Sequence, residues 1–310
     1  MVNSTMVTEF ILTGFADVWK LRWLQAVVFL LMYLATNLGN LLIITVTTID
    51  QKLQTPMYFF LRNVSILYMC YISVTVPNAC AQSLTGKRTI SVAACATQTF
   101  LVIYCAYVEV MFLTIMAQDR YVAIWQPLHY PIIMNHQFCV QMTLASLLSG
   151  LVYTGVHTGN TFQLPFCKSN VMHQFFCDIP SLLRLSCSDT FRNELLIFVS
   201  SIGICGSCFI FIAISYTCIF SMVLKFPTRE QGKAFSPCIP HILVVSVFLS
   251  CGFYEHLRPS VNSETTLDMI FSVFYTIVPP FLNPIIYSLR NKQVKKSVRK
   301  VILGKPYSGK

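Results

Sequence analysis

Charged side chains are scarce in this sequence. Only 11% of its 310 residues are Asp, Glu, Lys or Arg, whereas 55% are hydrophobic. An ordinary soluble domain carries about 25% charged residues. So little charge excludes a surface that faces water on all sides, and we expect lipid to be the main solvent of the chain.

The motifs of common enzyme sites are also missing. The sequence contains no H-E-x-x-H, no G-x-S-x-G and no phosphate-binding glycine loop. These motifs supply the metal ligands, the nucleophile or the phosphate cradle of several large enzyme classes. We therefore expect no enzymatic activity, no cofactor and no nucleic-acid partner.

The first 23 residues do not resemble a cleavable signal peptide. They contain Glu9, Asp17, Lys20 and Arg22, without a basic segment followed by an apolar one. We expect the first apolar span to act as the insertion signal.

Long apolar segments dominate the rest of the chain. About 20 apolar residues in a helix cross the hydrocarbon core of a bilayer, and a helix satisfies its own backbone there. We predict an all-α integral membrane protein, a seven-transmembrane helix bundle with a short amphipathic C-terminal helix. The predicted spans are Leu24–Thr48, Met57–Cys80, Gln98–Ile124, Val140–Asn160, Leu195–Leu224, Cys238–Leu257 and Leu267–Leu289.

Positive charge predicts the orientation of these spans. The segment Arg290–Lys310 contains eight Lys or Arg residues and no Asp or Glu. The positive-inside rule places it in the cytoplasm and, with seven spans, the amino terminus outside. We expect one seven-transmembrane domain over residues 1–310: an extracellular segment 1–23, a bundle 24–289 and a cytoplasmic tail 290–310. The tail is either a solvated surface helix or an amphipathic helix on the inner leaflet, since Val294, Val298, Val301 and Ile302 recur at helical spacing between the bases.

Four of the 13 cysteines lie in the segments predicted to be extracellular. Cys95 lies just outside the third span, and Cys167, Cys177 and Cys187 lie between the fourth and fifth spans. The extracellular compartment permits disulfides, and four cysteines allow three pairings that spacing cannot distinguish. A zinc site is a poor alternative because these loop cysteines are ten residues apart and form no C-x-x-C pair. Asn3-Ser4-Thr5 is a glycosylation acceptor in the same compartment.

The third span ends at its cytoplasmic side in Asp119-Arg120-Tyr121. Alone, this acid–base pair only marks the inner membrane boundary. The longer stretch "MAQDRYVAIWQPLHYPIIMN", however, resembles the third-span signature of olfactory receptors, a branch of the rhodopsin-like G-protein-coupled receptors. Further matching segments follow in the right order: "GN" at Gly39-Asn40, "TPMYFFLRNVS" at Thr55–Ser65, "SY" at Ser215-Tyr216, "KAFSPC" before His241, and "PPFLNPIIYSLRN" at Pro279–Asn291.

The resemblance covers nearly the whole chain and implies a mechanism. A small volatile odorant would bind within the bundle and favour the state in which the sixth span swings outward at the cytoplasmic side. A G protein of the stimulatory, olfactory type would then bind there and raise cyclic AMP, in the plasma membrane of olfactory neuron cilia. The resemblance also implies the disulfides Cys95–Cys177 and Cys167–Cys187.

The same resemblance assigns a switch. Arg120 would pair with Asp119 at rest and turn toward Tyr216 and Tyr287 in the active state, while Pro284 permits a bend in the seventh span. The implied switch residues are Asp119, Arg120, Tyr121, Tyr216, His241, Asn283, Pro284 and Tyr287.

Candidate ligand contacts follow from position on the outer halves of the helices. Most are apolar, as small-molecule sites usually are, and each could equally serve helix packing. They are Val102, Ile103, Ala106, Tyr107, Ser200, Ile204, Leu249, Gly252, Phe253, His256, Val273 and Thr276.

Several positions depart from the family pattern: Gln118, Trp125, Pro237, Pro240 and above all Tyr68, where the family has an aspartate. In related receptors that aspartate and a carboxylate at the place of Glu109 hold a sodium ion. Tyr68 is neutral and bulky, so we expect no metal site here and a protonated or Tyr68-bonded Glu109. Pairing of Glu109 with Asn40, Asn283 or Ser65 is the alternative.

Three other classes of membrane protein can also have long apolar spans. A transporter or channel would usually show paired charges or broken helices near the midplane, and only Glu109 qualifies. A receptor-like chain with weak or lost coupling, or a non-olfactory chemosensory receptor, is compatible with the same sequence.

Overall fold

The computed structural model describes residues 7–13, 19–167, 169–172, 174–225, 227, 231, 238–257 and 266–303. Within the last two ranges, the side chains of 251–257, 266–272, 275, 289, 290, 292 and 302 fall outside the description. Asn3 and Pro237 lie outside the described residues.

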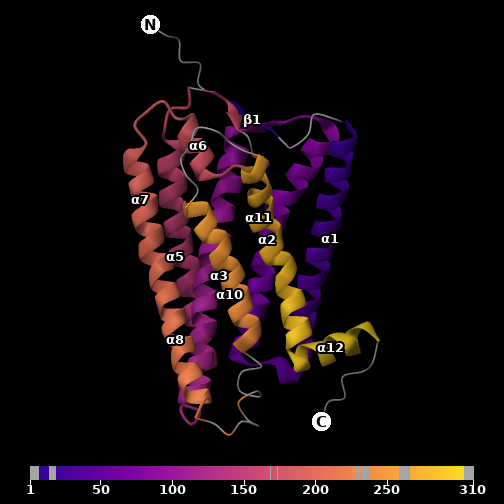
Figure 1. Ribbon diagram of the computed structural model, residues 1–310, viewed down its shortest axis with the longest axis vertical. Helices are drawn as coiled ribbons and strands as arrows, with labels where there is room; N and C mark the ends of the chain where they lie inside the picture. Colours follow the sequence, from indigo (N-terminus) through magenta and orange to yellow (C-terminus); the bar gives the residue numbers. More distant parts are fainter. Residues whose placement is uncertain are drawn as a thin grey trace.

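Long helices lie side by side in one elongated bundle (Figure 1). Each of the seven predicted spans corresponds to one of them, so the predicted fold class is confirmed. The helices are α1 (Trp19–Ile49), α2 (Pro56–Thr85), α3 (Val92–Trp125), α5 (His136–Phe162), the continuous run of α7 (Phe191–Ser201), the π-helical η2 (Ile202–Gly206) and α8 (Ser207–Val223), then α10 (Cys238–Leu257) and α11 (Thr266–Arg290).

Length and composition make these helices suitable for a membrane. Among the described residues, five helical runs are long and apolar enough to cross one, and α10 adds a shorter apolar stretch, Cys238–Ser250. Large apolar side chains such as Leu24, Leu31 and Leu38 of α1 are exposed on the outside of the bundle. Such a surface is stable against lipid, since leaving it in water would be costly.

Helix ends follow local capping chemistry. Ser91 accepts a hydrogen bond from the backbone of Ala94 at the start of α3, and Asn135 does the same for Phe138 at the start of α5. α2 ends at Gly86, whose φ of 74° is the left-handed conformation that glycine adopts readily. Several helices extend beyond the predicted spans: α1 begins at Trp19 rather than Leu24, and α3 begins at Val92 rather than Gln98, so that Cys95 lies in its first turn.

A small sheet covers one end of the bundle, and the sequence analysis did not predict it. The strand β1 (Glu9–Leu12) pairs antiparallel with β2 (Thr89–Ser91) and parallel with β3 (Val171–Met172). Phe10 and Leu12 of β1 are buried in a cluster with Cys95 and Cys177. We call this sheet, together with the loop between α5 and α7, the outer cap (Figure 1). The segment predicted as a plain extracellular terminus therefore contributes a strand to it.

The opposite end carries the predicted C-terminal helix, α12 (Lys292–Ile302), which leaves the axis of the bundle (Figure 1). Asn291 caps it by accepting hydrogen bonds from the backbones of Gln293 and Val294. Val294 is fully buried, and Val298 and Val301 pack against the bundle core. The valines of the apolar stripe therefore pack against the bundle. The Ile302 side chain lies outside the description.

Two further short helices in the described part of the chain lie in loops. α4 (Tyr130–Ile133) follows α3, and α6 (Ile179–Leu185) follows the loop cysteine Cys177. A 3-10 helix, η1 (Gln51–Leu53), joins α1 to α2. These elements position the side chains described below.

Candidate functional site

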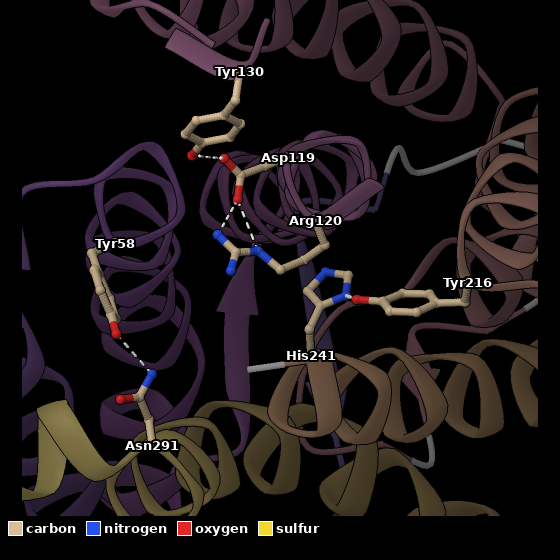
Figure 2. A network of polar contacts seen from close by, with 7 residues as sticks. All are labelled: Tyr58, Asp119, Arg120, Tyr130, Tyr216, His241 and Asn291. Atoms are coloured by element: carbon tan, nitrogen blue, oxygen red, sulfur yellow. Dashed lines mark hydrogen bonds and ion pairs between the residues drawn. The ribbon is translucent and has the colours of Figure 1, made fainter. Parts of the chain in front are cut away.

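The inner end of α3 holds a buried ion pair. Asp119 has no exposed surface, and its Oδ2 accepts hydrogen bonds from Arg120, at 2.9 Å from Nε (Figure 2). The hydroxyl of Tyr130 donates to the other oxygen, Oδ1, at 2.7 Å. A buried carboxylate is tolerable only when its charge is paired and its oxygens are hydrogen-bonded, and both conditions are met here.

Tyr130 belongs to the loop helix α4, outside the membrane-spanning segments. Burial, together with the charge of Asp119 and the hydrogen bond to it, raises the pKa of Tyr130 above its ordinary value, against the opposing charge of Arg120. The phenol therefore stays protonated and remains a donor to Asp119. Sequence analysis missed this residue, although it lies only eleven positions after Asp119.

Two further predicted switch residues contact each other beside this pair. Tyr216 of α8 and His241 of α10 are joined by a 2.6 Å hydrogen bond between the phenol oxygen and Nδ1 (Figure 2). This contact links α8 to α10 at the end of the bundle that carries α12. Within the described residues, the Nε2 of His241 and the hydroxyl of Tyr287 are buried without a hydrogen-bond partner, so each has the capacity for a further hydrogen bond.

A second set of contacts joins α2, α11 and α12. Asn291 donates from Nδ2 to the hydroxyl of Tyr58 at 2.8 Å (Figure 2) while its Oδ1 caps α12. The hydroxyl of Ser297 on α12 donates to Asp50 in the loop between α1 and α2. These two side chains hold α12 at its angle to the bundle.

Gly39-Asn40 of α1 lies against the segment of α11 that contains Pro284. Pro284 has no backbone N–H, so the helical carbonyl four residues earlier, that of Pro280, loses its partner. The Nδ2 of Asn40 donates to this carbonyl at 3.1 Å. A Cβ on Gly39 would lie only 3.1 Å from the Cβ of Pro284, so glycine permits the close approach of α1 to α11. Asn40 of the first span thus supplies the hydrogen bond that Pro284 removes from the seventh span.

Glu109 lies in the middle of α3 and is buried. The hydroxyl of Tyr68 on α2 donates to its Oε1. The alternative partners are not engaged: Ser65 Oγ and both side-chain polar atoms of Asn283 have no hydrogen bond within the described residues. The predicted Tyr68 contact is therefore present. No group of three or more metal-ligating side chains occurs in the part of the chain that the structure describes.

The predicted ligand contacts lie along the outer halves of their helices. Tyr107 of α3 stacks on Tyr153 of α5, with ring centroids 4.9 Å apart. Ser200 of α7 is 3.0 Å from His157 of α5. Leu249 and Val273 pack against core clusters, Thr276 is buried, and the half-buried members are Val102, Ile103, Ala106 and Ile204. Gly252, Phe253 and His256 lie on α10, but their side chains fall outside the description.

Two disulfides hold the outer cap in place at the ends of these helices. The structure contains the disulfides Cys95–Cys177 and Cys167–Cys187, with Cα–Cα distances of 5.5 and 5.7 Å. The backbone N–H of Cys177 also donates to Oε1 of Gln98 at 2.9 Å. The loop between α5 and α7 is therefore fixed to the outer end of α3.

Comparison with known proteins agrees with this geometry. The sequence model described as olfactory receptor matches residues 29–305. Human olfactory receptor 14C36 is 63% identical over 303 residues, covering 97% of both chains, and human olfactory receptor 14A16 is 48% identical over 306 residues, covering 98% of this chain and 99% of the relative.

The fold has a well-characterised counterpart. The crystal structure of squid rhodopsin superimposes with a TM-score of 0.70 at 18% identity, covering 95% of this chain and 85% of that one. At that identity the likeness establishes the fold alone. Taken with the family match and the close relatives, it leads to one conclusion: the chain belongs to the olfactory receptor family, a multi-pass membrane protein of the rhodopsin-like G-protein-coupled receptor fold that acts as a receptor for odorants and not as an enzyme.

Proposed function

We propose that this receptor binds a small volatile odorant among α3, α7, α10 and α11 and activates a G protein of the stimulatory, olfactory type, raising cyclic AMP. The amino terminus would be extracellular and the tail cytoplasmic, in the plasma membrane of olfactory neuron cilia. Residues 1–310 would act as one receptor domain, with the bundle between residues 24 and 289.

The polar cluster at the inner end of the bundle carries this proposal. Arg120 is held by Asp119, and Asp119 is held by Tyr130. Tyr216, the predicted active-state partner of Arg120, is occupied by His241. These contacts fit a resting state in which the G-protein site is closed. An odorant that binds the open state more tightly would shift the population, and only this differential affinity can do so.

Position of the two ends supports the orientation. β1 lies at one end of the bundle and α12 at the other (Figure 1), and the disulfides lie at the β1 end. Disulfides persist in oxidising compartments, whereas the positive-inside rule favours the cytoplasm for the basic tail.

A cyclic-AMP reporter in cells that express the receptor tests the coupling. A broad odorant panel should contain compounds that raise cyclic AMP in cells with the receptor and not in mock-transfected cells. Responses only through a calcium-linked G protein, or no response from receptor at the cell surface, would contradict the stimulatory assignment.

The Tyr68–Glu109 contact would replace a sodium site. One carboxylate is missing, and the phenol occupies the space of a hydrated ion. We expect exchange of sodium for a large organic cation at matched ionic strength to leave basal and odorant-evoked signalling nearly unchanged. A strong sodium effect that disappears in Glu109→Gln would show that an ion site survives.

A further inference from the structure

The outer part of α5 carries a polar face that the predicted ligand site did not include. Thr154, His157, Thr158 and Thr161 are buried, whereas Leu151, Val152 and Val156 of the same helix are exposed. Spacings of three and four residues place the four polar side chains on one face of the helix. That face is turned toward the bundle, where α5 packs on α3, α6 and α7.

Three atoms on this face lack a hydrogen bond. They are Oγ1 of Thr154, Nδ1 of His157 and Oγ1 of Thr158, all buried and all without a partner within the described residues. Leaving a buried polar atom unpaired costs about 1–3 kcal/mol, and most buried polar atoms in proteins are paired. Three such atoms on one face of the helix therefore indicate a place where another molecule supplies the partner.

The hydrogen bonds around His157 define what that partner must offer. Ser200 donates its hydroxyl hydrogen to the carbonyl of Ile197 at 3.1 Å. Its oxygen, 3.0 Å from Nε2 of His157, is then the acceptor, so Nε2 carries the ring hydrogen. A neutral imidazole with hydrogen on Nε2 has a lone pair on Nδ1. The unpartnered Nδ1 is therefore a hydrogen-bond acceptor.

Aromatic side chains lie next to this acceptor. The ring of Tyr153 is 4.3 Å from that of His157, and the ring of Tyr107 stacks on Tyr153. The hydroxyl of Tyr153 is occupied by Ser201 at 3.2 Å. A Cβ on Gly150 would come within 3.2 Å of Tyr107 Cδ1, so the glycine lets α5 approach α3 closely at this level. Apolar rings beside one acceptor and two hydroxyls are the composition of a small-molecule site.

We propose that α5 contributes a specificity subsite in which Nδ1 of His157 accepts a hydrogen bond from the odorant, with Thr154 and Thr158 as further polar contacts. The subsite selects odorants that carry a hydroxyl or another hydrogen-bond donor, such as aliphatic alcohols, over isosteric compounds without one. The inference rests on the proposed odorant-receptor function and adds α5 to the helices predicted to form its site.

A matched ligand series tests the subsite. Aliphatic 1-alcohols of increasing chain length and their methyl ethers are applied to cells with a cyclic-AMP reporter. We expect the preferred alcohol to be about tenfold more potent than its ether, because one hydrogen bond to a buried acceptor is lost. Ethers as potent as the alcohols would overturn the proposal. Absence of any response to alcohols while other odorants without a donor activate the receptor would overturn it equally.

Two substitutions of one residue separate the role of Nδ1 from that of Nε2. An Asn side chain places its carbonyl at the depth of Nδ1, whereas a Gln side chain reaches to the depth of Nε2. His157→Asn should keep the alcohol preference, and His157→Gln should lose it at equal surface level. Thr161→Val is the control, because its hydroxyl already donates to the carbonyl of His157. Equal behaviour of the Asn and Gln variants would contradict the assignment.

A measurement without signalling keeps this result distinct from failure of coupling. Receptor labelled with 15N-histidine in lipid nanodiscs should show an unprotonated Nδ1 for the signal that disappears in His157→Gln. Addition of the preferred alcohol should shift that signal, and addition of its ether should not. A shift without cyclic AMP would refute the proposed coupling only, and no shift with an active alcohol would refute the subsite.

Discussion

The two ends of the bundle are built differently. At the outer end, two disulfides and a three-stranded sheet join the amino-terminal strand, the loop before α3 and the loop after α5. At the inner end, the helices are joined by side-chain hydrogen bonds and the Asp119–Arg120 pair. Covalent bonds and strand pairing do not exchange on the time scale of signalling, whereas side-chain contacts do.

This difference assigns separate tasks to the two ends. At the outer end, the Cys95–Cys177 bridge fixes the loop between α5 and α7 to the first turn of α3. The inner end offers alternative partners, because Tyr287 and His241 each retain a buried polar atom without a partner among the described residues. Under the proposed function, the covalently linked end would hold the ligand site in place, and the hydrogen-bonded end would rearrange to couple the G protein.

The largest effect should come from breaking the outer cap. Removal of a native disulfide typically costs about 2–5 kcal/mol. Cys95→Ser and Cys177→Ser should therefore lose cell-surface expression, measured by flow cytometry on a tagged receptor. Cys70→Ser is the matched control, because Cys70 is a free and exposed cysteine. Finding Cys95 as a free thiol in mature receptor by mass mapping would contradict the comparison.

The next effect should fall on signalling. Arg120→Ala removes the cation that would line the open G-protein site, while the apolar packing of α3 is kept. Asp119 then keeps only its Tyr130 hydrogen bond, so surface expression should fall. At matched surface level we expect cyclic AMP no higher than in mock-transfected cells when an active odorant is added. Normal cyclic-AMP responses at matched surface level would show that signalling does not depend on Arg120.

Tyr130→Phe should destabilise the resting state, with a smaller effect on signalling than Arg120→Ala. Tyr130→Phe removes a hydrogen bond to the Asp119 carboxylate, and hydrogen bonds to charged groups contribute about 1.5–3 kcal/mol. Basal cyclic AMP should rise severalfold, since the pair that holds Arg120 is weakened. Tyr33→Phe loses a hydroxyl contact with Ser73 on the exposed surface and should change nothing. Unchanged basal signalling in Tyr130→Phe would place the resting constraint elsewhere.

The smallest effect concerns the angle of α12 and its dependence on pH. Although burial raises the pKa of Asp50, the Ser297 hydrogen bond, the Lys52 backbone and the charges of Lys300 and Lys52 together lower it below its ordinary value. A carboxyl with a lowered pKa in the folded state stabilises that state above its unfolded pKa, about 3.9, and loses this contribution as pH falls through the folded value.

Ser297→Ala should therefore lower the melting temperature slightly at neutral pH and reduce the loss of stability on acidification below about pH 4. Thermal unfolding of nanodisc-embedded receptor at several pH values measures both. Identical acid profiles for wild type and Ser297→Ala would mean that the Asp50 contact contributes nothing to the docking of α12.

Sequence patterns were sufficient for the parts that repeat through the chain. Apolar length predicted every long helix because each one satisfies its backbone locally. The cost of an unpaired carboxylate in lipid predicted a partner for Glu109, with Tyr68 as one of two alternatives. Contacts between distant segments were not predictable in this way. β1 is only four residues long and pairs with strands about 80 and 160 positions away.

The functional side chains that the sequence did not predict were missed for the same reason: they depend on contacts between separate elements. Tyr130, Asn291 and His157 belong to common residue types, and only the packing of helices reveals that each contacts a predicted functional residue or caps another element. A usable signal existed for His157: a histidine among threonines at helical spacing in an apolar span is costly unless it is partnered.

A distance measurement at both ends tests the central comparison most directly. Spectroscopic labels, introduced as noncanonical amino acids at the exposed positions Leu128 and Ile239, report the separation of the inner ends of α3 and α10, and labels at Thr89 and Phe191 report the outer cap. In nanodiscs with the olfactory-type G protein, an active odorant should lengthen the inner distance and leave the outer distance unchanged. An inner distance that stays constant while the G protein exchanges its nucleotide, or a larger change at the outer pair, would contradict the account.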